Sequence, residues 1–112
     1  MSQANTLMTP RVIPSNYTLP EHEVLDLGAF KQLGAEINVL TAGGQGGENM
    51  LIETAAINED TAFKPIPGML ADMGTAGTTH VYTDQFMRYI RAKASGTVTG
   101  SPVVAINTIS KA

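Results

Sequence analysis

The stretch "YIRAKASGTVTGSPVVAINTI", residues 89–109, is the most regularly patterned part of this chain. In its first half Ile90, Ala92 and Ala94 alternate with polar residues, which is the two-residue period of a β-strand with one buried face. A segment with two glycines and a proline separates this half from a second, more apolar strand. The pattern predicts a hairpin whose inward side chains form the core: Ile90, Ala92, Val104 and Ile106.

The outward positions of the first strand carry charge. Arg91 and Lys93 are expected to be solvated or paired at an interface rather than catalytic. Continuing the alternation backward puts Arg88 on the apolar face beside Phe86. Two explanations fit: a β-bulge between Arg88 and Ile90 resets the register, or Arg88 is buried against a carboxylate partner.

The chain from Glu21 onward repeats this style in shorter pieces. The segments "HEVLDLG", "AEINVLTAGG", "NMLIETAAI" and "THVYTD" are strand-like and are separated by turn residues about every ten positions. Two prolines in "TAFKPIPG" confine that segment to a sheet edge or exclude it from the sheet. "DLGAFKQLGAE" has room for at most about two helical turns. The sequence therefore predicts an all-β fold, a single antiparallel β-sandwich over residues 21–112.

Residues 1–20 differ in composition. They contain three of the six prolines and one charged side chain, Arg11, together with several apolar residues. Proline restricts both itself and the preceding residue to extended conformations. The segment is either an extended arm that docks on another protein, or a terminus whose apolar groups pack on their own domain. An arm would present these residues to its partner: Arg11, Val12, Ile13, Tyr17 and Leu19.

Composition excludes several classes of function. The chain has 112 residues, enough for one domain, and its net charge of −3 leaves no basic surface for nucleic acid. It has no run of eighteen apolar residues that would span a membrane, and no signal peptide is visible at its start. Cysteine is absent, which excludes disulfides, thiolate metal sites and a cysteine nucleophile.

No residue pattern indicates catalysis, a metal or a cofactor. His22 lies between two glutamates in "PEHE", but on a strand it would point away from both. His80 opens a strand and is expected on the surface. The glycine-rich "GGQGG" lacks the Lys-Ser/Thr of a phosphate-binding loop and is expected to be a hinge. The chain is therefore predicted not to be an enzyme, with no catalytic, metal or cofactor-binding residue.

Several segments, taken in order, resemble small structural proteins of tailed bacteriophages. They are "AEINVLTAGGQGG", "MLIETAAINEDTAF", "PIPG" and the closing "GTTHVYTDQFMRYIRAKASGTVTGSPVVAINTISKA", so the resemblance covers roughly residues 21–112. It implies a β-sandwich or jelly-roll virion component that coats or cements a capsid, or that belongs to the tail or the head–tail junction.

The resemblance carries expectations about partners and place. The chain is expected to be a capsid decoration or cement protein that binds the major capsid protein and itself, as a homodimer or homotrimer. It would lie on the exterior of a virion assembled in the host cytoplasm, with no contact to nucleic acid or membrane. Two alternatives remain: a minor tail or head–tail protein, and a carbohydrate-binding module for host attachment. The latter depends on exposed aromatic side chains, and aromatics make up only 5% of this chain.

Overall fold

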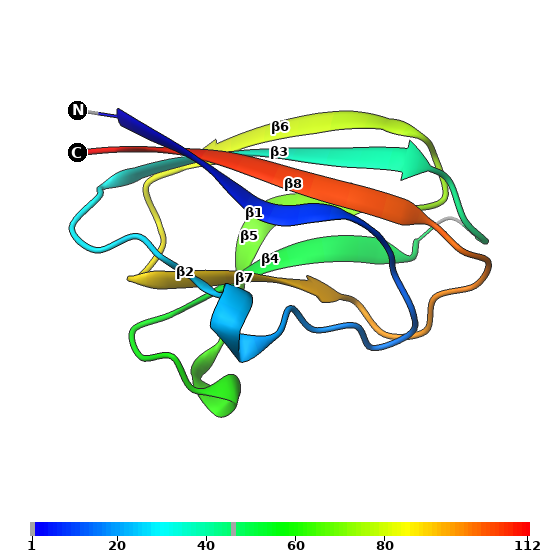
Figure 1. Ribbon diagram of the computed structural model, residues 1–112, viewed down its shortest axis with the longest axis horizontal. Helices are drawn as coiled ribbons and strands as arrows, with labels where there is room; N and C mark the ends of the chain where they lie inside the picture. Colours follow the sequence, from blue (N-terminus) through cyan, green and yellow to red (C-terminus); the bar gives the residue numbers. More distant parts are fainter. Residues whose placement is uncertain (1, 46) are drawn as a thin grey trace.

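The computed structural model describes residues 2–45 and 47–112 as two four-stranded antiparallel sheets packed face to face (Figure 1). One sheet has the strand order β1-β8-β3-β6 and the other β2-β7-β4-β5. Two single-turn 3-10 helices, η1 and η2, interrupt the strands. The elements are β1 (Ser2–Val12), η1 (Glu21–Glu23), β2 (Leu25–Asp26), β3 (Gln32–Thr41), β4 (Asn49–Ala55), η2 (Asp60–Ala62), β5 (Lys64–Asp72), β6 (Gly77–Thr83), β7 (Tyr89–Ala94) and β8 (Val103–Lys111).

The strand pairs are nested along the chain. β4 pairs with β5, β3 with β6, β2 with β7, and β1 with β8, all antiparallel. A chain folded in this way is a long double strand rolled into two sheets, which is the jelly-roll arrangement. The predicted all-β antiparallel sandwich is therefore confirmed, and the pairing places the first and last strands beside each other.

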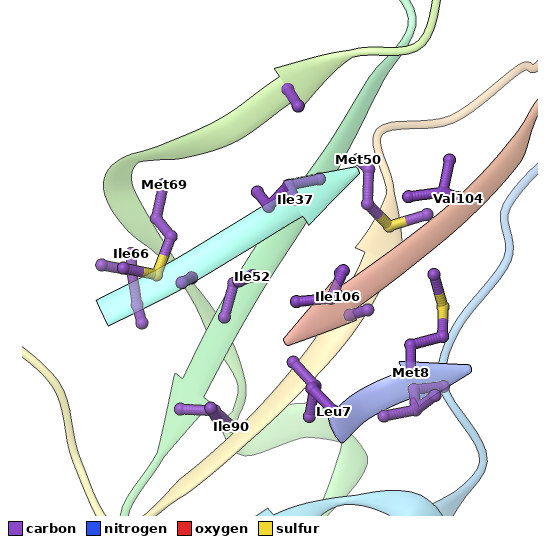
Figure 2. Packing of buried hydrophobic residues seen from close by; sticks show 14 of the residues in the cluster. Leu7, Met8, Ile37, Met50, Ile52, Ile66, Met69, Ile90, Val104 and Ile106 are labelled. Carbon is purple, nitrogen blue, oxygen red and sulfur yellow. The ribbon is translucent and has the colours of Figure 1, made fainter. Parts of the chain in front are cut away.

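The core lies between the two sheets. Figure 2 shows Ile37 and Ile106 of one sheet gathered with Ile52 and Ile90 of the other, and all four are fully buried. Four methionines also lie in the core, where their flexible side chains fill the irregular space between sheets. The inward residues predicted from the alternation are all completely buried: Ile90, Ala92, Val104 and Ile106.

The predicted hairpin over residues 89–109 is wrong in its pairing. β7 and β8 are both strands, but they belong to different sheets, and residues 95–102 pass from one sheet to the other. The backbone of Pro102 accepts a hydrogen bond from Ile13 N at 2.9 Å, and that of Gly96 accepts one from Asn16 N at 2.8 Å. The two-residue period reveals which face of a strand is buried, but the same period results whichever sheet contains the strand.

Residues 2–20 are part of the sandwich, which corrects the predicted boundary between an arm over 1–20 and a domain over 21–112. β1 pairs with β8 from Ser2 opposite Lys111 to Val12 opposite Val103, so the segment is extended as expected but is an edge strand of the sheet. A register shift between Thr6 and Met8 turns two consecutive side chains, Leu7 and Met8, into the core. Burial of these apolar groups and the β8 ladder hold the segment in place. Met1 lies outside the described residues.

Three further segments can be compared with what the sequence predicts for them. β5, which contains Pro65 and Pro67, is an edge strand, as the prolines require. The part of "DLGAFKQLGAE" expected to allow a short helix forms instead the end of β2, a turn and the start of β3. The described part of the "GGQGG" loop packs against Thr99. At Gly44, which has φ +54°, a Cβ would collide with Thr99, so only glycine fits there. Gly46, in the middle of this loop, lies outside the described residues.

Candidate functional site

The outer face of the sheet β1-β8-β3-β6 is the candidate functional site. Side chains alternate across this sheet, so those that do not enter the core are displayed together on its outer side. We call this surface the open face and define it by nine residues: Thr6, Gly34, Glu36, Asn38, Thr78, His80, Tyr82, Asn107 and Ile109.

A row of polar side chains crosses all four strands of the open face. Thr6 lies directly opposite Asn107, Asn107 opposite Glu36, and Glu36 opposite His80. The Thr6 hydroxyl donates to Asn107 Oδ1 at 3.4 Å, and Asn107 Nδ2 donates to Glu36 Oε1 at 3.3 Å. His80 Nε2 lies 3.1 Å from Glu36 Oε2. These contacts fix the orientation of polar groups that are nevertheless accessible to a partner.

Glu36 is the centre of this network. Asn38 Nδ2 donates to Glu36 Oε1 at 2.9 Å, and Asn38 Oδ1 in turn accepts from the Thr78 hydroxyl at 2.8 Å. The hydrogen bond from Asn38, followed by those from His80 and Asn107, holds the pKa of the Glu36 carboxyl below its usual value. Glu36 is therefore a carboxylate at neutral pH with most of its acceptor sites engaged by its own sheet.

A shallow hollow lies beside the polar row. Gly34 lies directly opposite both Tyr82 and Ile109 on the neighbouring strands. These residues and their neighbours border a hollow of about 390 Å³. The Tyr82 ring covers Gly34, where a Cβ would stand 2.7 Å from the ring. An aromatic ring that covers a strand glycine is a known way of stabilising a sheet. Tyr82 is nevertheless 76% exposed, so the ring also presents a large apolar surface to solvent.

The outer face of the other sheet is covered by the chain itself in the region around Arg91. Arg91 and Glu53 lie opposite each other on β7 and β4, and Arg91 Nε donates to Glu53 Oε1 at 2.9 Å. Arg91 Nη1 also donates to Asp60 Oδ1 at 2.8 Å, and its guanidinium lies 4.2 Å from the centre of the Phe63 ring. The Arg91 side chain is only 8% exposed. Figure 1 shows η2, which contributes Asp60, projecting below this sheet.

This arrangement corrects the expectation for Arg91, which is neither solvated nor free to pair across an interface. Lys93, the next outward residue, is half-buried and donates from Nζ to the Thr18 hydroxyl at 3.1 Å. Residues 56–63 and 13–24 therefore cover the part of this face around Arg91 and Lys93. A hollow of about 480 Å³ remains between these segments, and Leu70 on β5 is still 39% exposed.

Arg88 has the carboxylate partner offered by the second explanation, but it is not buried, and the β-bulge is not present. β7 begins at Tyr89, so Arg88 lies before the strand and no bulge is needed. Arg88 is more than half exposed and makes a two-pronged ion pair with Asp26, with both N–O distances 2.9 Å. This pairing lowers the pKa of the Asp26 carboxyl. The alternation of β7 does not include Arg88, because the strand begins one residue later.

The predicted contact residues of the arm are divided between core and surface. Ile13 and Leu19 are buried in the core, so they are not accessible to a partner in this structure. Val12 is 55% exposed at the end of β1. Arg11 is half-buried and donates to Tyr17 Oη at 2.9 Å and to Glu23 Oε1 at 2.8 Å. The ion pair with Arg11 lowers the pKa of the Glu23 carboxyl. The same ion pair links β1 to η1.

The described residues show no assembled centre for metal chemistry. In 2–45 and 47–112, no three Asp, Glu or His side chains lie close enough to hold a metal ion. His22 is largely exposed, and His80 belongs to the open face. Among these residues there is also no helix of the length and apolarity needed to cross a membrane.

Comparison with known proteins identifies a fold. No family model and no curated protein matches this sequence. A solved structure, described as the SPBc2 prophage-derived protein YomS, superposes with a TM-score of 0.58. The match covers 98% of this chain and 92% of that protein, at 14% sequence identity. The two proteins therefore share a fold over nearly their whole length.

The open face was not identified from the sequence. Its residues stand at ordinary outward positions of "AEINVL", "THVY" and "VAINTI", where polar side chains are typical of a solvated strand face. The register that lines up Asn107, Glu36 and His80 joins strands that are remote along the chain. The one available signal was Gly34 inside a strand, which marks a close approach by another group.

Proposed function

We propose that this chain is a structural protein of a bacteriophage particle, a capsid decoration or cement protein that binds the major capsid shell through its open face. Two observations support a phage origin. The sequence resembles small structural proteins of tailed phages, and the fold is shared with a protein described as prophage-derived. A jelly roll is also a common architecture of viral capsid domains.

The open face is the observation that carries the proposal. Glu36 is the only Asp, Glu, Lys or Arg among its nine residues, whereas Tyr82 and Ile109 expose apolar surface. Protein interfaces are depleted of charged residues at their centre and enriched in aromatic ones. The polar row is already held in place by hydrogen bonds within the sheet, which reduces the entropy lost on binding.

The contribution of the N-terminal segment changes in this proposal. Val12 lies opposite Val103 at one end of the same sheet and is exposed, so it can extend the contact surface. The other four residues of the expected arm stabilise the sandwich and do not contact the capsid: Arg11, Ile13, Tyr17 and Leu19. The function requires no catalysis, cofactor, nucleic acid or membrane, and it places the chain on the exterior of a virion assembled in the host cytoplasm.

Binding to isolated capsids tests this proposal. The variant Tyr82→Ala removes the largest exposed group of the open face, and Met87→Ala serves as a matched control, because Met87 is also exposed but lies outside the open face. We expect Tyr82→Ala to weaken cosedimentation with capsids at least tenfold, about 1.4 kcal/mol. The Met87→Ala protein should bind like the unmodified chain. Equal loss in both variants, or in neither, would contradict the use of the open face.

A minor tail or head–tail protein is the alternative within the same class. It would use the same surface against a ring of a few subunits rather than a shell. Tail fractions separated from heads would then retain the chain, whereas a decoration protein should remain with the heads.

A carbohydrate-binding module is the second candidate function, and Tyr82 is the observation that favours it. Its exposed ring stands beside Asn107, Glu36 and His80 in hollows on one face, and sugar-binding sites combine an aromatic platform with amide and carboxylate groups. Titration with host cell-wall polysaccharide distinguishes this function. Saturable binding that Tyr82→Phe retains and Tyr82→Ala loses would favour it over the capsid shell.

A further inference from the structure

The edge strand β6 has features that suit pairing with another strand. Each sheet of the sandwich has two edges, and an edge strand exposes backbone N–H and C=O groups that can pair with another chain. Proteins usually protect such edges with prolines, bulges, charged side chains or very short strands.

Three of the four edges are protected in these ways. β1 carries Pro10 and two register shifts. β5 carries Pro65 and Pro67 together with Gly68, and its pairing with β4 is also interrupted. β2 is only two residues long, and the backbone around Thr18 pairs with β7 next to it.

β6 lacks all of these protective features. Its sequence "GTTHVYT" contains no proline, lysine, arginine, aspartate or glutamate, and it pairs with β3 without any register shift. Threonine, valine and tyrosine are strong strand formers. Figure 1 shows β6 along the upper margin of the molecule, and it is the last strand of its sheet in the described chain.

We propose that β6 pairs antiparallel with β6 of a second copy of this chain, forming a two-fold symmetric dimer with a continuous eight-stranded sheet. A two-fold axis through the middle of Gly77–Thr83 aligns the whole strand with itself. It places His80 opposite His80 of the partner subunit, and Thr78 opposite Tyr82 of the partner subunit. In this register outward residues meet outward residues, as continuous pleating requires.

The inner side of β6 also suits this pairing. Thr79 and Val81 face inward and are only half-buried, and Val81 already packs against the core. The same register brings Val81 opposite Thr79 of the partner subunit, so both residues lose their remaining exposure. A β-branched pair of this kind stabilises neighbouring strands.

The dimer would join the two open faces into one surface. The row Thr6, Asn107, Glu36 and His80 would continue into the same row of the second copy in reverse order. This consequence rests on the proposed function. Each dimer would have two attachment points to a repeating shell, which strengthens attachment without new contacts. The pairing itself does not depend on what the open face binds.

Single cysteines test the register, since the chain has no cysteine of its own. Directly opposed residues of antiparallel strands have Cα atoms about 4.5–5.5 Å apart, within disulfide range. His80→Cys should therefore give a covalent dimer under mild oxidation. Thr78→Cys is the matched control, because the two copies of this position lie about 13 Å apart along the strands. The double variant Thr78→Cys/Tyr82→Cys should again form the dimer.

Sedimentation of the unmodified chain supplies the second readout. The protein should sediment at twice the 11.8 kDa monomer mass. His80→Lys places a cation beside Glu36 but opposes two like charges at the axis, so it should weaken dimerisation at least tenfold without unfolding the monomer. A monomer at all concentrations, a trimer, or equal crosslinking of Thr78→Cys and His80→Cys would overturn the inference. All of these outcomes are measured on the chain without capsids, so failure of the dimer is distinguishable from failure of the proposed function.

Discussion

The two outer faces of this sandwich begin from similar sequence and end in different states. On β3, Glu36 lies between buried neighbours and stays accessible within an exposed polar row. On β7, Arg91 also lies between buried neighbours, yet it is itself buried under η2 and Phe63. Both charged residues occupy outward positions of alternating strands.

The difference shows that alternation determines the inner face of each sheet but not the fate of its outer face. Whether an outward side chain meets water is decided by connections elsewhere in the chain. Here residues 56–63 and 13–24 cover Arg91 and Lys93 on the β2-β7-β4-β5 sheet, whereas the polar row of the other sheet stays accessible. An outward polar row that stays accessible is a natural place for binding.

The largest expected effect comes from breaking the covered face. Arg91→Ala leaves the buried carboxylate of Glu53 without its partner, so we expect a loss of about 3–5 kcal/mol in the free energy of unfolding, measured by urea denaturation. Arg88→Ala is the matched control, because Arg88 also pairs with a carboxylate but on an exposed site. That variant should lose much less stability, because water screens an exposed ion pair. Equal losses would show that burial of the Arg91 pair has no energetic consequence.

A smaller effect is expected beneath the open face. The Thr108 hydroxyl is buried on the inner side of β8 and has no hydrogen-bond partner among the described residues. Thr108→Val replaces this hydroxyl by a methyl group, so we expect stability to rise by about 1 kcal/mol. Thermal unfolding measures this change.

The Thr108→Val variant also separates the two sides of the sheet. Capsid binding should be unchanged, since the substitution alters the inner side of β8 only. A destabilised protein would contradict the assignment of Thr108 as an unsatisfied group, and altered binding would contradict the independence of the open face.

The smallest expected effect is a change of folding stability with pH at Glu36. The pKa of Glu36 is lowered in the folded protein from its ordinary value near 4.5. A carboxyl with a depressed pKa contributes stability above its unfolded pKa, and this contribution is lost as the pH falls through the folded pKa. We therefore expect the small stability difference between the unmodified chain and Glu36→Gln to shrink as the pH is lowered from about 6 to about 3. A difference that grew in acid would contradict the network around Glu36.

The sequence predicted the parts of the fold that depend on local pattern. Alternation identified Ile90, Ala92, Val104 and Ile106 as core, and the prolines of β5 correctly placed that strand at an edge. It could not assign β7 and β8 to different sheets, because strand pairing depends on contacts between distant segments.

The candidate site was less predictable for the same reason. Ile13 and Leu19 were expected to contact a partner, but their apolar side chains fill the sandwich's own core. Proline-stiffened, extended chain fits an arm and an edge strand equally well, and only the pairing of β1 with β8 distinguishes them. The open face in turn requires the register of four strands, which no local pattern contains.

The most direct test of the central claim is the copy number of this chain in phage particles purified from cells that carry its gene. Quantitative mass spectrometry measures its ratio to the major capsid protein. The account predicts a ratio near one to one, or a simple fraction of it, that falls when Tyr82→Ala replaces the unmodified chain. Absence of the chain from the particles would contradict a structural role in the virion, and a few copies per particle would assign it to the tail or the head–tail junction.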